Sequence, residues 1–303
     1  MRRRLLRALG VTSLVFVACL IAILGLLVLA ERTNLSFGGN RVALVEVEGI
    51  ILDADRVVRE IEEHLEDSSI RAIVVRIQSP GGVVAPTQEI YDAIRRARAK
   101  GKPVVASMGA IAASGGYYLA VAADRIVANP GTLTGSIGVL MQLADLEGLL
   151  KKVGVHLTVV KAGRYKDLGN LGQPMSEEER AILQALLDDI YDQFVTAVAE
   201  GRGLDRTRVL GLADGRVYSG RQAKELGLVD TLGGLEDAVR TAGDLAKIPG
   251  KPRLVRPRRP FRLADLLDWV ASQTPLGGLT STRGALPSIS SLGSAKLPLF
   301  LME

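Results

Sequence analysis

The stretch that decides the fold is Val104-Val105-Ala106-Ser107-Met108, followed by Ala112-Ala113-Ser114-Gly115-Gly116-Tyr117-Tyr118. The first part is an apolar run that predicts a strand, and residues 117–123 predict a helix with small and apolar faces. A serine at a strand-to-helix turn has an exposed hydroxyl and backbone N–H groups directed past it, which is the geometry that an acyl-transfer nucleophile needs. The alternative is that Ser114 only caps the helix, with Gly115 and Gly116 permitting close packing.

Strand-like and helix-like runs alternate on both sides of this stretch. Alternation of this kind predicts an α/β fold with a mostly parallel sheet and covering helices. Two helix starts carry capping boxes, formed by Ser176 with Glu179 and by Ser219 with Gln222. The predicted strands are residues 42–47, 72–77, 104–108, 125–128 and 157–160, and the predicted helices are residues 57–64, 87–99, 117–123, 177–199 and 220–226.

A second glycine-rich turn, Ser79-Pro80-Gly81-Gly82, follows the predicted strand at residues 72–77. Paired glycines take backbone angles that are closed to other residues, so they can direct a backbone N–H at a carbonyl oxygen. The alternative is an ordinary turn, which an isolated Pro-Gly-Gly sequence also predicts.

The candidates for a catalytic base are few, because the chain has only two histidines, His64 and His156. His64 lies in a helix-like apolar stripe and His156 precedes a strand-like run, so neither stands in a glycine-rich loop. A Ser-His-Asp triad is therefore not predicted. A desolvated lysine that is neutral near pH 7 is an alternative base. Lys166 lies in Lys161-Ala162-Gly163-Arg164-Tyr165-Lys166-Asp167, where the other interpretation is a solvated loop lysine.

Taken together, these segments resemble the short form of signal peptide peptidase A, a membrane-bound Ser-Lys peptidase of the Clp protease/crotonase fold group. The resemblance runs from about Val42 to about Ala246. Each motif is weak alone, whereas the set in this order and spacing is specific. The motifs are Ser79-Pro-Gly-Gly, Ala113-Ser-Gly-Gly-Tyr-Tyr, Leu133-Thr-Gly-Ser-Ile-Gly-Val, Lys161-Ala-Gly-Arg-Tyr-Lys-Asp, and Ala213-Asp-Gly-Arg-Val-Tyr-Ser-Gly-Arg-Gln-Ala followed by Gly227-Leu-Val-Asp.

The resemblance implies a role for three side chains. Ser114 is implied as the nucleophile, Lys166 as the general base, and Ser136 as the hydroxyl that orients the lysine. The alternative for Ser136 is a plain turn serine. Lys161 is a second candidate base, but the family's lysine aligns with Lys166.

The resemblance also implies an oxyanion hole built from the backbone N–H groups of Gly82 and Gly115, with Gly81 as an alternative to Gly82. It implies a Clp protease/crotonase-like fold, no metal and no cofactor. The implied substrates are released signal peptides and other apolar peptides, and the implied assembly is a ring-like homo-oligomer.

A membrane anchor is predicted near the N-terminus. Residues 9–30 carry no charge, and this length is enough to cross a hydrocarbon layer of ~30 Å. Four arginines precede the run, so the positive-inside rule places the N-terminus in the cytoplasm and the catalytic domain on the extracytoplasmic side of the cell membrane. The alternatives are a cleaved signal peptide and a lipoprotein attachment at Cys19, the only cysteine.

The predicted organisation of the 303 residues has five parts. These are a basic N-terminus (1–8), the anchor (9–30), a linker (31–40), a peptidase domain (41–248) and a basic, Pro/Gly/Ser-rich tail (249–303). The net charge of +5 depends on the N-terminal arginines and on basic residues in 251–262, so the predicted peptidase domain shows no nucleic-acid footprint. The basic tail is either a solvated linker or a contact with membrane lipid.

Two other functions fit parts of this pattern. A crotonase-like acyl-CoA enzyme uses the same paired backbone N–H groups but has no need of Ser114 as a nucleophile. A non-enzymatic membrane scaffold needs neither Ser114 nor Lys166. The presence of both residues and the predicted export favour the serine endopeptidase.

Overall fold

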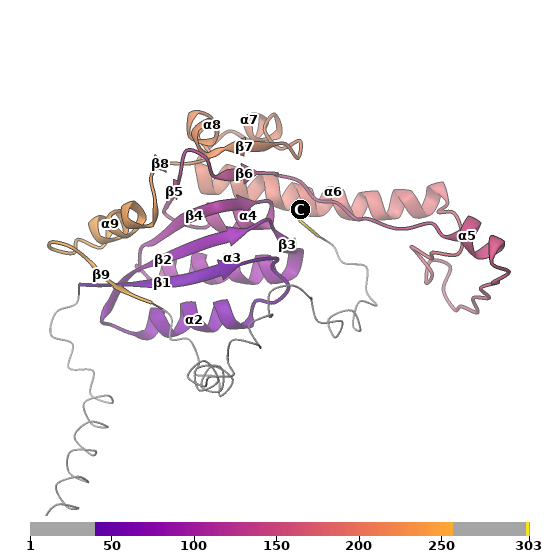
Figure 1. The fold of residues 1–303 in the computed structure, drawn as a ribbon, viewed down its shortest axis with the longest axis horizontal. Coiled ribbons are helices and arrows are strands. Elements are labelled where there is room, and N and C mark those ends of the chain that lie inside the picture. The colour runs from indigo at the N-terminus through magenta and orange to yellow at the C-terminus, as the bar shows by residue number, and fades with distance from the viewer. Residues whose placement is uncertain (1–39, 257–300, 303) are drawn as a thin grey trace, which may run out of the picture. The chain divides into compact units, whose positions relative to one another are not determined.

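The computed structural model describes residues 40–256 and 301–302 (Figure 1). Among these residues, no helix combines the length and apolar character needed to cross a bilayer. The predicted anchor at residues 9–30 and most of the predicted tail lie outside the described residues.

The described residues are organised around an eight-stranded sheet with the order β7-β6-β4-β2-β1-β9, in which β5 joins β4 to β8. All of its described pairings are parallel except that of β6 with β7, which confirms the predicted mostly parallel sheet. The register places Leu44 opposite Val74, and Val74 opposite Val105. The strands are β1 (Arg41–Glu48), β2 (Ile70–Ser79), β4 (Val104–Ala113), β5 (Arg125–Ala128), β6 (Leu133–Gly135), β7 (Val217–Ser219), β8 (Thr231–Leu232) and β9 (Arg253–Val255).

Helices cover both faces of the sheet, because neighbouring residues of its central strands point to opposite faces. Ala43 and Val45 pack into the core shared with the helices of one face, whereas Val42 and Leu44 pack against α9 on the other. Ser176 and Ser219 form the predicted capping boxes at the starts of α6 and α8. The helices are α2 (Asp55–Glu66), α3 (Val84–Ala99), α4 (Gly115–Val121), α5 (Glu147–Lys152), α6 (Glu177–Arg202), α7 (Arg206–Leu210), α8 (Gly220–Glu225) and α9 (Leu235–Leu245).

The strand predicted at residues 157–160 is wrong. This segment has no strand partner among the described residues, and Val160 is 96% exposed. Its apolar alternation belongs to an arm that leaves the sheet, so it has neither a neighbouring strand nor a core to pack on. Local pattern alone did not reveal this, because a strand needs a neighbour to complete its hydrogen bonds.

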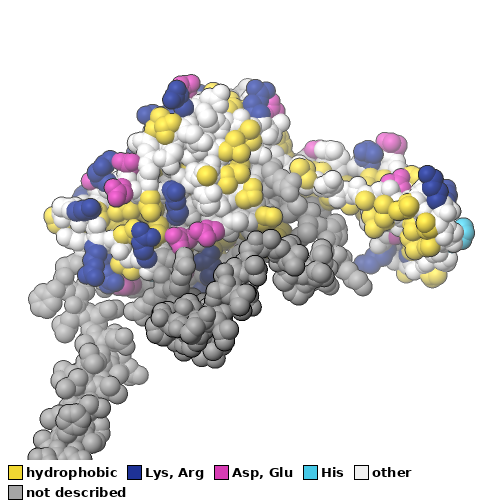
Figure 2. Space-filling view, viewed as in Figure 1, with side chains coloured by type: hydrophobic (Ala, Val, Ile, Leu, Met, Phe, Trp, Pro, Cys, Tyr) yellow, Lys and Arg dark blue, Asp and Glu magenta, His cyan; other side chains and the backbone are white. Residues whose placement is uncertain are grey.

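The arm (residues 139–187) consists of loops, α5 and the first part of α6. It extends away from the sheet and its covering helices, which we call the body (Figure 1). The buried residues of α6 all lie toward its C-terminal end, from Phe194 to Val198. Figure 2 shows hydrophobic side chains gathered on the arm's surface. The large apolar residues exposed there include Leu146, Leu149, Val153, Leu157, Val160, Leu171, Ile182 and Leu186.

The end of α6 that reaches the body is held by a partly buried ion pair. Arg202 donates two hydrogen bonds to the carboxylate of Asp230, at 2.9 and 2.8 Å, and a third to the carbonyl of Gly227 at 3.0 Å. Asp230 also accepts the backbone N–H of Ile126 in β5 at 2.7 Å. The long helix is therefore fixed at one end to the sheet, and its other end supports the arm.

His64 lies on α2 and faces Glu60, with 4.0 Å between its Nε2 and a Glu60 Oε1. Both atoms are buried, and neither has a hydrogen-bond partner in the part of the chain that the structure describes. Burial lowers the pKa of His64 and raises the pKa of Glu60. The structure therefore favours the neutral forms of both groups, and their effects on stability have opposite pH dependence.

His64→Gln is expected to reduce the loss of stability in mild acid. Because the folded pKa of His64 is lowered, its contribution is complete above the unfolded pKa of about 6.5 and is lost as the pH falls through the folded value. Urea unfolding at several values between about pH 7.5 and pH 5 measures the free energy of unfolding across this range. His156→Gln, at the other histidine, is the matched control. Parallel curves for wild type and His64→Gln would contradict the prediction.

Candidate active site

Ser114 lies at the turn between β4 and α4, as the sequence predicts. Its backbone angles are φ 51° and ψ −119°, a conformation that residues with a side chain rarely adopt. The turn is fixed on both sides, because Ser114 N–H donates to the carbonyl of Gly135 and Ser114 C=O accepts from Tyr118 N–H, each at 2.8 Å. The surrounding fold therefore maintains a strained backbone at the predicted nucleophile.

The Ser114 side chain is buried, so the prediction of an exposed hydroxyl is wrong. Ser114 is 0% exposed, because the turn lies between the buried end of β4 and α4, whose residues are all buried. Among the described residues, its Oγ has no hydrogen-bond partner. A buried hydroxyl without a partner costs about 1–3 kcal/mol. A polar atom left in this state at a strained turn is typical of a reacting group.

The predicted oxyanion loop lies against this turn. A Cβ on Gly115 would lie only 3.2 Å from the backbone nitrogen of Gly82. A Cβ on Gly82 would lie 2.1 Å from the carbonyl oxygen of Ile51, so only glycine fits there without movement. The two glycines predicted as oxyanion donors are therefore neighbours in space, although 33 positions separate them in the sequence.

Ser136 follows β6 and shares a cavity with the glycine loop. It has a positive φ of 50°, and Ser114 and Ser136 are two of the three non-glycine residues with positive φ in the described chain. Its N–H donates to the carbonyl of Arg216 at 2.9 Å. The backbone is thus strained at both predicted site serines, and the sequence carried no signal for this at Ser136.

A cavity of about 260 Å³ with a mostly apolar lining includes Ala113, the residue before Ser114, and Ser136 in its wall. Residues at its mouth are large and open to solvent, with Ile50 58%, Leu133 40% and Val217 51% exposed. These residues come from separate parts of the sequence, so motif analysis did not find them. The full lining is Ile50, Pro80, Gly81, Gly82, Ile111, Ala113, Leu133, Ser136 and Val217.

The short strand β3 (Gly82–Val83) pairs with a strand from the far end of the chain. In β10 (Leu301–Met302), Leu301 lies opposite Val83 and Met302 opposite Gly82, in antiparallel register. The edge that carries the predicted oxyanion donor therefore accepts an extended peptide segment.

Lys166 lies in the arm, in a turn over residues 164–169, and it is exposed. The structure does not bring its Nζ within hydrogen-bond distance of Ser114 Oγ, which has no partner. Lys161, the second candidate base, pairs with Asp167. Within one chain, the predicted nucleophile and the predicted base thus lie on different parts of the molecule.

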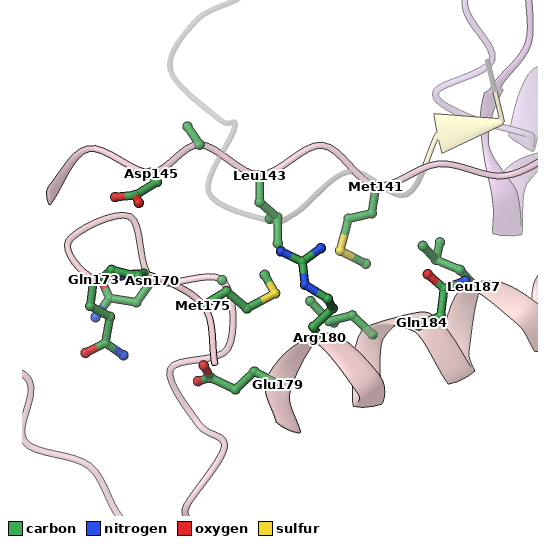
Figure 3. A pocket seen from close by; sticks show the side chains of 14 residues that line it. Met141, Leu143, Asp145, Asn170, Gln173, Met175, Glu179, Arg180, Gln184 and Leu187 are labelled. Carbon is green, nitrogen blue, oxygen red and sulfur yellow. The ribbon is translucent and has the colours of Figure 1, made fainter. Parts of the chain in front are cut away.

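A larger cavity of about 470 Å³ lies within the arm, between the 141–145 segment, the 169–175 loop and the start of α6. Figure 3 shows Met141, Leu143 and Met175 pointing into it around Arg180. No serine, cysteine or histidine is among its lining residues. It therefore offers no hydroxyl, thiol or imidazole, whereas the smaller cavity is lined by Ser136 and by Ala113, the neighbour of Ser114, and is the better candidate.

Residues 96–249 match peptidase family S49, and residues 53–131 match the Clp protease family. The chain belongs to peptidase family S49. This S49 peptidase is 48% identical over 216 residues to a Synechocystis protein that is named as a candidate protease. The alignment covers 71% of this chain and 78% of the relative. It is 37% identical to Protease 4 of Salmonella typhi, over 69% of this chain and 35% of the relative. It is 34% identical to the chloroplastic serine protease SPPA of Arabidopsis thaliana, over 80% of this chain and 36% of the relative.

These matches confirm the resemblance to signal peptide peptidase A and the prediction of a serine peptidase. The Clp protease match agrees with the parallel sheet and its covering helices. The S49 chain spans only about a third of the length of the Salmonella and Arabidopsis relatives, at 35% and 36%.

Proposed function

We propose that this S49 peptidase is a membrane-anchored serine endopeptidase in which Ser114 and Lys166 form the catalytic dyad. The observation that carries the proposal is the buried, unpartnered Ser114 hydroxyl at a strained turn beside two glycine backbone nitrogens. We further propose that residues 9–30 anchor the chain and that the catalytic domain works on the extracytoplasmic side. This position suits the degradation of signal peptides left in the membrane.

The proposed reaction begins when neutral Lys166 accepts the proton of Ser114 as its Oγ attacks a peptide carbonyl. The carbonyl oxygen then carries the negative charge, which the N–H groups of Gly82 and Gly115 stabilise. The loss of one such donor typically costs about 2.7–4 kcal/mol. Protonated Lys166 returns the proton to the leaving amine, and water hydrolyses the acyl-enzyme by the same steps. Ser136 orients the lysine.

The hydrogen bonds of the glycine loop favour Gly82 over Gly81 as the second donor. Gly81 N–H already donates to Ser79 Oγ at 3.1 Å. A donor used inside the loop is not available to a substrate oxygen. The nitrogen of Gly82 lies beside Gly115, where a second donor is needed.

The surroundings of Ser114 support an extended apolar peptide as substrate. The apolar cavity suits a hydrophobic side chain next to the scissile bond. The edge of β3 already pairs with a strand in antiparallel register, and strand addition is a common way to bind peptides without regard to most of their side chains. Signal peptides supply both features, an extended backbone and apolar side chains.

The position of Lys166 supports a ring-like homo-oligomer in which the arm of one copy reaches the Ser114 turn of the next. The arm exposes a row of large apolar side chains, and soluble surfaces of this kind usually mark interfaces. A head-to-tail contact that repeats and closes produces a ring. A closed ring also admits extended chains while excluding folded proteins.

Labelling with an active-site serine reagent tests the proposed function. A fluorophosphonate should form one covalent adduct on the full-length protein in detergent, and peptide mapping should place it on Ser114. Ser114→Ala should abolish the adduct, whereas Ser107→Ala, which removes another buried serine hydroxyl, should keep it. An intact enzyme that hydrolyses no apolar peptide and forms no adduct would refute the proposal. It would then favour a crotonase-like enzyme or a scaffold.

Leu133→Ala is expected to change substrate preference more than general activity. Leu133 lines the mouth of the cavity, so its truncation removes contacts with a large apolar residue at the cleaved bond. We expect kcat/KM to fall about tenfold for peptides with leucine at this position and to change little for peptides with alanine. Leu245→Ala, a partly exposed leucine on α9, is the matched control. An equal loss for both peptides would contradict the assignment of this cavity.

A further inference from the structure

Ser79, the last residue of β2, has a fully buried side chain directly beneath the glycine loop. Its Oγ accepts the N–H of Gly81 at 3.1 Å and lies 3.3 Å from the carbonyl oxygen of Gly81, to which it donates. One hydroxyl therefore holds both polar backbone groups of a single glycine. We propose that Ser79 is a positioning residue that sets the direction of the Gly82 N–H. This inference rests on the proposed function.

The link from Ser79 to Gly82 is the planar peptide bond. The carbonyl of Gly81 and the N–H of Gly82 belong to the same peptide unit, and in a trans peptide these two groups point in opposite directions. No cis peptide occurs among the described residues. Fixing the carbonyl of Gly81 therefore fixes the N–H of Gly82 on the opposite side.

The carbonyl of Gly81 is held from two directions. It accepts the N–H of Ile51 at 2.9 Å in addition to the Ser79 hydroxyl. Ile51 in turn accepts the N–H of Val83 at 2.8 Å. Ile51 thus fixes the outer side of the loop, and Ser79 fixes the inner side. Glycine at position 81 has a φ of 126°, which leaves this peptide free to rotate without such bonds.

Ser79 also connects the loop to the nucleophile turn. A Cβ on Gly116 would lie 2.7 Å from the carbonyl oxygen of Ser79 and 3.5 Å from its Cβ. Ser79 therefore packs on the first turn of α4, directly after Ser114. A residue that contacts Gly81 and Gly116, the chain neighbours of the two proposed donors, is placed to keep the N–H groups of Gly82 and Gly115 at a constant separation.

The test is Ser79→Ala in the full-length protein. Loss of the hydroxyl frees the Gly81–Gly82 peptide to rotate, so kcat should fall about 10- to 100-fold, less than the 100- to 1000-fold loss typical of a deleted donor. KM should change by less than about threefold, since the hole acts mainly in the transition state. Binding of a peptide aldehyde, whose adduct places an oxyanion in the hole, should weaken in parallel with kcat.

Three comparisons separate positioning from simple stability. Ser107→Ala deletes an equally buried hydroxyl that accepts from Arg76, so it should lower stability without lowering kcat. Ser79→Thr retains the hydroxyl and should restore kcat. If Ser79→Ala fails to fold, Ser79→Cys replaces it in the test. Cysteine is similar in size to serine but a weaker hydrogen-bond partner, so kcat should again fall.

A Ser79→Ala or Ser79→Cys enzyme with wild-type kcat and aldehyde affinity would overturn the inference while the labelled wild type still supported the proposed function. The same holds if Ser107→Ala lowers kcat as much as Ser79→Ala. If the wild type forms no adduct at Ser114 and hydrolyses no peptide, the proposed function fails and the role of Ser79 fails with it.

Discussion

Ser114→Ala is expected to lower kcat by about ten-thousand- to million-fold, because removal of a nucleophile leaves only the binding site and the oxyanion hole. Lys166→Ala should cause a loss of similar size. The double variant should be no worse than either single variant, since the two side chains act as one unit. Initial rates on an apolar fluorogenic peptide, with the full-length protein in detergent, measure all three.

The fold should survive the Ser114 substitution. Ser114 Oγ is buried without a partner, so its removal deletes an unsatisfied group rather than a hydrogen bond. Thermal unfolding of Ser114→Ala should therefore match or exceed that of the wild type, whereas Ser107→Ala, which breaks a 2.9 Å bond from Arg76, should be less stable and fully active. A Lys166→Ala enzyme with near wild-type turnover would exclude this lysine as the base.

Much of the fold was predictable because its signals are local. Runs such as residues 72–77 and 104–108 are apolar on both faces, as expected for strands with helices on either side. The two capping boxes identified helix starts from side chains three residues apart. The segment at 157–160 has an equally strong local pattern but no partner strand within residues 40–256 and 301–302, and the sequence contains no signal for that absence.

The candidate site was predictable only in part, because only some of its features have local sequence signals. Ser114 and the Ser79–Gly82 loop could each be predicted from a short motif at the end of a strand. The cavity lining does not, because Ile50, Leu133 and Val217 become neighbours only after the sheet forms. The burial of Ser114 was missed too, since it depends on how the end of β4 and the start of α4 pack in the folded core.

Lys166 is separated from Ser114 because it lies on the arm, whereas Ser114 lies on the body. A lysine on the body would be close to the nucleophile in every isolated chain. In the proposed ring, the exposed Lys166 on the apolar arm would meet Ser114 of another copy only after the two copies have packed together. Assembly would then be a condition for catalysis, and an isolated copy would be inert toward the proteins that it meets.

Co-assembly of inactive Ser114→Ala chains with inactive Lys166→Ala chains is therefore expected to restore activity. Each Lys166→Ala chain still supplies an intact serine, and each Ser114→Ala chain supplies an intact lysine to its neighbour. Random mixing in a head-to-tail ring should recover about a quarter of the wild-type activity, from almost none in either parent.

The mixed assembly is verified by two affinity tags on the two chains and by its mass, and activity is measured on the doubly tagged fraction. Each parent variant carried through the same dissociation and reassembly is the control. Shared sites should also be labelled by a fluorophosphonate only on the Lys166→Ala chains, because only these retain Ser114. A verified mixed ring without recovered activity would mean that the dyad forms within a single chain, and that the arm must fold back onto its own body.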